Sequence, residues 1–129
     1  MSPKWILVVD DDLNLRHSLA LVLKSAGYTV TTAGLACEAL ECLEHANYDL
    51  AILDVVMIDN RLNLLPSVLR LYPHLPILVF TAEWSPETAV ETEKLGVRAH
   101  LVKPVTPKCL LECVDTILNS SPVMVNPQE

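Results

Sequence analysis

Glycine is scarce in this sequence, and the few glycines stand far apart. The 129 residues include 3 glycines, at Gly27, Gly34 and Gly96. Both the GxGxxG turn of dinucleotide-binding domains and the GxxxxGK[ST] phosphate loop need closely spaced glycines. The sequence therefore excludes nucleotide binding of these two kinds.

The cysteines lack any spacing typical of metal binding. There are 4 of them, and no two form a CxxC pair. A chain of 129 residues buries roughly two thirds of the surface that it exposes when unfolded, so it needs neither a disulfide nor a structural metal to fold. We expect Cys37, Cys42, Cys109 and Cys113 to be reduced, small buried residues of helices.

Basic side chains are also few, 9 against 16 acidic ones, which gives a formal net charge of -7. Nonspecific affinity for nucleic acids comes mostly from clustered Lys and Arg, so we expect no direct nucleic-acid binding by this domain. No apolar run approaches the roughly 18 residues of a membrane span, and the run at 5–9 is too short for a signal peptide. We therefore expect a cytoplasmic protein without a membrane partner.

Short apolar runs alternate with segments of helical periodicity along most of the chain. The runs predict strands at residues 5–9, 28–32, 48–53, 76–80 and 99–102. The periodic segments predict helices at residues 13–26, 35–46, 64–72, 86–95 and 108–119. The length suits one domain over 1–120, and the proline-containing segment 121–129 is expected to be a C-terminal tail or the stub of a linker.

Strand and helix units in this succession predict an α/β fold with a doubly wound, five-stranded parallel sheet and helices on both faces. In the flavodoxin-like form of this architecture the strand order is 2-1-3-4-5, and ligands bind at the carboxyl ends of the strands. The alternation by itself leaves other strand orders open. It does define which residues follow the strands.

Chemically competent side chains follow four of the predicted strands. Asp10 and Asp11 come after the first, Asp54 after the third, Thr81 after the fourth and Lys103 after the fifth. Carboxylates brought together repel one another unless a cation lies among them, and oxygen ligands without nearby His or Cys suit Mg²⁺. An aspartate can itself act as a nucleophile and form an acyl phosphate, and Asp54, in the central strand, is the candidate.

In order, the motifs at these strand ends resemble those of the receiver domain of two-component response regulators. They are ILVVDDD at 6–12, YDLAILDVVM at 48–57, LVFTA at 78–82 and HLVKP at 100–104. The resemblance covers residues 6 to about 119. It implies that Asp54 accepts a phosphoryl group from a phosphohistidine of a sensor histidine kinase or phosphotransfer protein.

The resemblance also implies a magnesium site. Asp11, Asp54 and the main-chain carbonyl of Val56 would bind Mg²⁺ directly, and Asp10 would bind it through water. Thr81 and Lys103 would contact the phosphoryl oxygens.

Further implications concern the signalling face. The Lys103-Pro104 peptide is usually cis in this family. Thr81 and the ring at position 100 act as the switch that alters the face formed by helix 4, strand 5 and helix 5. That face would engage a downstream effector domain or protein, or a second copy in a homodimer.

Three residues depart from the pattern of the family. Ile58 and Leu62 stand where a proline and a glycine are usual, which stiffens and enlarges the loop beside the site. His100 replaces the usual Tyr or Phe, and a charged imidazole resists burial. We hypothesise a switch that is weakened at low pH.

Two helices carry expectations about partners. Leu13, Ala20 and Leu21 lie off the core stripe of the first helix, which favours a docking surface for a helical phosphotransfer domain. The fourth helix, rich in charge, is expected to be weakly anchored and to move readily.

The leading interpretation is thus a phosphorylation-dependent signalling switch and not a metabolic enzyme, with slow loss of its own phosphoryl group. Two alternatives stay open. One is a receiver-like interaction module that works without phosphorylation. The other is an aspartyl-nucleophile phosphatase of the haloacid dehalogenase type, although that family places its nucleophile in a DxD motif on the first strand.

Overall fold

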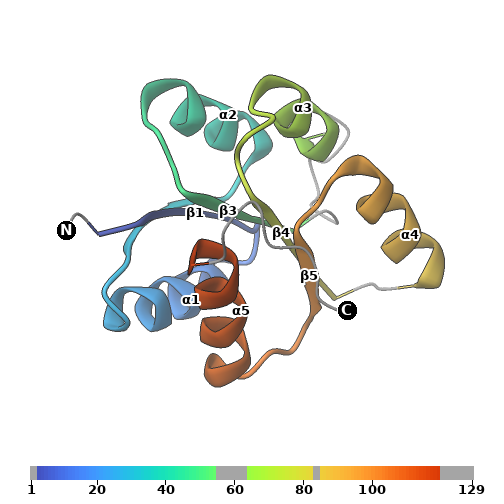
Figure 1. Ribbon diagram of the computed structural model, residues 1–129. Helices are drawn as coiled ribbons and strands as arrows, with labels where there is room; N and C mark the ends of the chain where they lie inside the picture. Colours follow the sequence, from blue (N-terminus) through green and yellow to red (C-terminus); the bar gives the residue numbers. More distant parts are fainter. Residues whose placement is uncertain (1–2, 55–63, 83–84, 120–129) are drawn as a thin grey trace.

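The computed structural model describes residues 3–54, 64–82 and 85–119 (Figure 1). Strands and helices alternate through this part of the chain, as the periodicity predicts. The strands are β1 (Trp5–Val9), β2 (Thr29–Ala33), β3 (Leu50–Leu53), β4 (Ile77–Thr81) and β5 (Ala99–Val102). The helices are α1 (Leu13–Ser25), α2 (Ala36–His45), α3 (Leu64–Leu71), α4 (Pro86–Leu95) and α5 (Pro107–Asn119).

All strands run parallel in one 5-stranded sheet, in the order β2-β1-β3-β4-β5. This confirms the predicted fold class and strand order. At the carboxyl end of β1, Val9 lies opposite Ala33 of β2 on one side and Leu53 of β3 on the other. The residues that follow Val9 and Leu53 therefore emerge side by side at one edge of the sheet.

Alternate residues of the strands enter two separate cores, because successive side chains of a strand point to opposite faces. Leu7 and Val9 pack in the core beneath α2 and α3. Ile6 and Val8 pack in the core beneath α1 and α5. The two helical layers lie on opposite faces of the sheet, as Figure 1 shows. All four of these strand residues are at most 1% exposed, so β1 is clamped from both sides close to its carboxyl end.

Strand β4 has the predicted length but is displaced by one residue along the chain. The apolar run predicts 76–80 with Thr81 at the carboxyl end, and the strand runs from Ile77 to Thr81, which pairs with Val102 of β5. Thr81 is thus the last residue of the strand, as expected, and it is fully buried.

The prediction that Ala20 is exposed on helix 1 is wrong. Ala20 is 6% exposed, whereas Leu13 and Leu21 are 54% and 70% exposed. Helix α1 packs against β2 as well as α5, so its buried face is wider than the predicted stripe and includes Ala20. An apolar surface on α1 therefore consists of the two leucines alone.

The cysteines lie in α2 and α5, as predicted, and all of them are free thiols. The expectation that they are buried is wrong for two of them: Cys37 and Cys109 are exposed, while Cys42 and Cys113 are half-buried. Each exposed cysteine falls in the first turn of its helix, on the side that faces away from the core. None of the helices in the described ranges is long and apolar enough to cross a membrane.

Helix α4 is held less firmly than α5. Among the described side chains of α4, only Thr92 is buried. On α5, Leu110, Val114 and Ile117 are all buried, at the spacing that the sequence predicts. Because burial of apolar surface drives helix packing, α4 is the more weakly anchored of the two, in agreement with its charged sequence.

Candidate functional site

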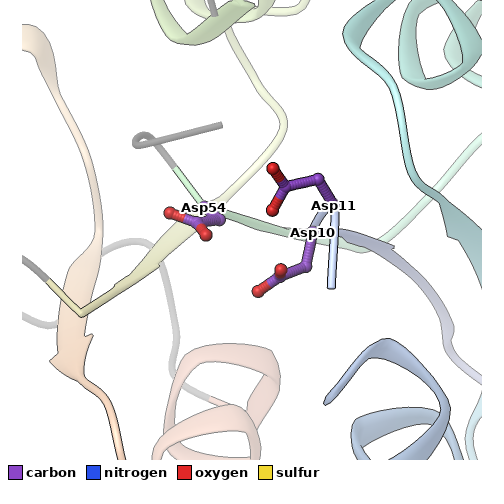
Figure 2. A group of neighbouring side chains, drawn as sticks. All are labelled: Asp10, Asp11 and Asp54. Atoms are coloured by element: carbon purple, nitrogen blue, oxygen red, sulfur yellow. The ribbon is translucent and has the colours of Figure 1, made fainter. Parts of the chain in front are cut away.

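Three carboxylates converge at the carboxyl edge of the sheet. Asp10 and Asp11 follow β1, and Asp54 follows β3 (Figure 2). One oxygen of each lies within 4.8 Å of the others. Asp10 is 1% exposed and Asp54 is 5% exposed, while Asp11 is half-buried. The adjacent parallel strands β1 and β3 bring Asp54 beside Asp10 and Asp11, although α1, β2 and α2 lie between these strands in the sequence.

Lys103 supplies the positive charge in this cluster. Its ammonium donates hydrogen bonds to Asp10 Oδ2 at 2.7 Å and to Asp54 Oδ2 at 2.9 Å. Burial by itself would lower the pKa of Lys103, but the hydrogen bonds to Asp10 and Asp54 outweigh it and raise the pKa above its ordinary value. The side chain is therefore a firmly protonated bridge between residues on two neighbouring strands.

Asp10 is held at every polar atom that it has. Its amide donates to Ala33 O at 3.1 Å, and its carbonyl accepts from Arg16 Nη1 at 2.8 Å. Its Oδ1 accepts from the amide of Asp12 at 2.9 Å, and its Oδ2 accepts from Lys103. Such a residue has a fixed orientation, and neither carboxylate oxygen is left without a donor.

Asp12 has a different task. It is exposed, and its Oδ1 accepts from the amide of Leu15 at 3.2 Å, which makes it the N-cap of α1. Side-chain acceptors at this position satisfy the otherwise unpaired amides of the first helical turn. Of the three consecutive acids, two thus face the cluster and the third begins the helix.

Thr81 and Lys103 meet at the ends of β4 and β5. The Lys103 amide donates to the Thr81 carbonyl at 2.8 Å, so both residues are anchored at the carboxylate edge. The Lys103-Pro104 peptide bond is cis. His100 lies further back, opposite Val79 and away from the end of β5.

A hollow of about 190 Å³ lies between α4 and β5, and His100 lines it together with Thr92 and Glu93. His100 is half-buried here. The structure thus places His100 in the region between the helix and the strand, and not among the carboxylates.

The arrangement suits a hard divalent cation. The cluster has more carboxylate charge than the single ammonium of Lys103 neutralises, and its ligand atoms are all oxygens, the type that Mg²⁺ prefers. Val56, whose carbonyl was expected to complete the site, lies outside the described residues, as do Ile58 and Leu62 and the segment 121–129.

Sequence reasoning missed Arg16 and Gly34. The guanidinium of Arg16 reaches back to the Asp10 carbonyl and lies against Gly34. The signal available in the sequence was Gly34 itself, one of 3 glycines in the chain. The structure shows that Gly34 is the one without a positive φ, so a close approach explains this glycine better than a turn does.

Comparison with known proteins agrees with this geometry. The family description "response regulator receiver domain" matches residues 6–115. The transcriptional regulatory protein GlrR of Escherichia coli K12 is 35% identical over 120 residues, which are 92% of this chain and 27% of the relative. The DNA-binding transcriptional regulator NtrC of Azospirillum brasilense is 38% identical over 122 residues, which are 94% of this chain and 25% of the relative.

Solved structures give the same result. The chemotaxis response regulator CheY4 of Vibrio cholerae superposes with a TM-score of 0.82 at 34% identity, covering 91% of this chain and 100% of that one. The chain belongs to the response regulator receiver domain family of two-component signal transduction. It spans about a quarter of the length of the curated relatives named above.

Proposed function

We propose that this domain is a phosphorylation-dependent switch whose phosphoacceptor is Asp54. The observation that carries the proposal is the position of Asp54, which shares the Lys103 ammonium with Asp10 at hydrogen-bond distance. A carboxylate beside a fixed cation and two further acids has the surroundings that phosphoryl transfer to an aspartate requires.

In the proposed reaction, an Asp54 carboxylate oxygen forms a bond to the phosphorus of a phosphohistidine. The phosphorus–nitrogen bond breaks, and its electron pair returns to the imidazole of the donor. Lys103 neutralises an oxygen of the transferred group, and the Thr81 hydroxyl donates to another. We expect slow loss of this group and no substrate turnover beyond self-phosphorylation.

Mg²⁺ fits the same residues. We propose that Asp11, Asp54 and the Val56 carbonyl are its direct ligands, and that Asp10 acts through water because donors already engage both of its carboxylate oxygens. When bound, the ion would offset the charge of the carboxylates and of the incoming phosphoryl oxygens.

The partners that we propose follow from the exposed surfaces. Leu13 and Leu21 form an apolar surface on α1 for a sensor histidine kinase or a phosphotransfer protein of the cytoplasm. Val90, Leu95 and Val102 are between 41% and 50% exposed on α4 and β5, where an effector or a second copy of the domain would bind. Thr81 and His100 would couple that surface to Asp54.

The test is phosphorylation with acetyl phosphate and Mg²⁺, followed by intact-mass and peptide-mass measurement. We expect one added phosphoryl group on Asp54, absent from Asp54→Asn and retained in the surface control Glu44→Gln. If neither acetyl phosphate nor a phosphorylated histidine donor modifies the protein, the result would favour the alternative function, a receiver-like interaction module that works without phosphorylation. Hydrolysis of many phosphates per protein would indicate a phosphatase.

A further inference from the structure

The Arg16 guanidinium occupies a place that the sheet itself leaves open. In the register of β1 and β2, the position after the pair Val9 and Ala33 brings Asp10 opposite Gly34. The Asp10 amide donates to Ala33 O at 3.1 Å. In a continued parallel ladder, the Asp10 carbonyl would accept from the amide of residue 35.

That next hydrogen bond of the ladder is not made. The amide of Leu35 donates instead to Glu38 Oε1 at 3.2 Å, and the amide of Gly34 donates to the same oxygen at 2.9 Å. The Asp10 carbonyl receives Arg16 Nη1 at 2.8 Å in its place. A side chain from the first turns of α1 thus replaces the backbone donor at the point where β1 and β2 separate.

Gly34 provides the space for this replacement. A Cβ atom at position 34 would lie 2.6 Å from Arg16 Nη1 and 3.1 Å from its Cζ, well inside van der Waals contact. Gly34 does not have the positive φ that would itself require glycine. Since Glu38 holds the Gly34 backbone, an added methyl group would displace the guanidinium more readily than the loop.

The contact acts on the peptide unit that joins Asp10 to Asp11. A hydrogen bond to the Asp10 carbonyl sets the orientation of that planar unit, and the unit carries the Asp11 amide and Cα. Arg16 Nε is buried without a hydrogen-bond partner among the described residues. Arg16 therefore keeps this position at the expense of one of its own donors.

We infer that Arg16 is a positioning residue for the carboxylate cluster and that Gly34 is glycine in order to admit it. Arg16 contacts the Asp10 carbonyl, and it acts on the cluster through the Asp10-Asp11 peptide. The expected effect on Mg²⁺ binding rests on the proposed function. The first measurement is therefore made without metal, so that the positioning role and the proposed function can fail separately.

The first measurement uses amide NMR shifts of Asp11 and Asp12 in the metal-free protein. We expect Arg16→Met and Gly34→Ala to move both resonances in the same direction, Arg16→Lys to restore part of the shift, and Arg70→Met, an exposed arginine of α3, to leave them unchanged. In the Arg16→Met background, Gly34→Ala should add nothing, since no guanidinium remains to be displaced.

The second measurement is Mg²⁺ affinity by titration of the same amides. Loss of a group that orients a metal ligand typically lowers affinity at least about tenfold, and we expect that loss in Arg16→Met and in Gly34→Ala, but not in Arg70→Met. Thermal unfolding of each variant separates this effect from simple destabilisation, and Gly34→Ala and Arg16→Lys keep the test available should Arg16→Met not fold.

Two results would overturn the inference. One is unchanged Asp11 and Asp12 amides in both Arg16→Met and Gly34→Ala. The other is an equal effect of Gly34→Ala with and without Arg16, which would show that the glycine serves something else. If the wild-type protein binds no Mg²⁺ and accepts no phosphoryl group while the metal-free shifts behave as expected, the proposed function fails and the positioning role stands.

Discussion

The two ends of the proposed signalling path are built very differently. At the carboxyl ends of β1 and β3, Asp10 is hydrogen-bonded at its amide, its carbonyl and both side-chain oxygens. On α4, which lies beside β5, Thr92 is the one buried side chain among those described. A site for group transfer gains from fixed geometry, and a surface that must change gains from weak packing. The predictions below test that contrast.

The largest effect should come from removing the cation of the fixed region. Lys103→Met leaves the nearly buried carboxylates of Asp10 and Asp54 without their shared donor, and breaking a buried ion pair in this way costs about 4 kcal/mol. We expect that loss in urea unfolding without Mg²⁺.

The exposed Lys94→Met serves as the control and should change the unfolding free energy by less than about 0.5 kcal/mol. Adding Asp54→Asn to Lys103→Met should recover much of the loss, because only one carboxylate then remains beside the vacated position. A Lys103→Met protein as stable as the wild type would show that the bridge contributes nothing.

A pair of leucine truncations compares the two helices next to β5. Leu110 of α5 is 1% exposed and Leu95 of α4 is 43% exposed. Leu110→Ala should lower the unfolding free energy by about 3 kcal/mol through the lost burial and the cavity left behind, and Leu95→Ala by about 0.5 kcal/mol. Equal losses in chemical denaturation would contradict the weak anchoring of α4.

Local opening should show the same contrast without any substitution. We expect amides of residues 86–95 to exchange about 30-fold faster than those of residues 107–119, since a helix with little buried apolar surface opens at lower free energy. Hydrogen–deuterium exchange followed by mass spectrometry gives both values in one experiment. Equal protection in α4 and α5 would remove the structural basis for calling α4 mobile.

A smaller effect is expected at His100, which lines the hollow between α4 and β5 beside Glu93 and Arg98. A protonated imidazole resists burial, so the phosphorylated protein should show its changed β5 amide resonances less completely at pH 6 than at pH 8. In His100→Tyr the two pH values should give the same extent of change. A wild-type response that is equal at both pH values would refute the hypothesis of a switch weakened by acid.

The smallest expected effect is an absence of pH dependence in the Lys103 bridge. Folding raises the pKa of Lys103, because hydrogen bonds to Asp10 and Asp54 outweigh its desolvation. Its stabilisation is thus fully present below the unfolded pKa of about 10.4 and is lost only as the pH rises through the still higher folded value. The difference in unfolding free energy between wild type and Lys103→Met should stay constant from pH 7 to pH 9.

Local sequence signals were sufficient for much of this molecule. Apolar runs and helical periodicity predicted every described strand and helix within a few residues. The strand order 2-1-3-4-5 was expected from the flavodoxin-like form of the architecture, and the structure confirms it. The errors, at Ala20, Cys37 and Cys109, all concern which side chains of a helix are buried and how wide its buried face is. Those properties depend on the neighbouring element, and a single segment does not report them.

By itself, the sequence determined the alternation of strands and helices and the acids that end β1 and β3, because hydrophobic period and chain order are local properties. Only the tertiary structure decided that Lys103 bridges Asp10 and Asp54, which precede it by 93 and 49 residues. It also decided that Arg16 replaces a backbone donor over Gly34. The physical reason is the same in both cases: sheet register sets which distant polar atoms come within hydrogen-bond distance, and no local period encodes it.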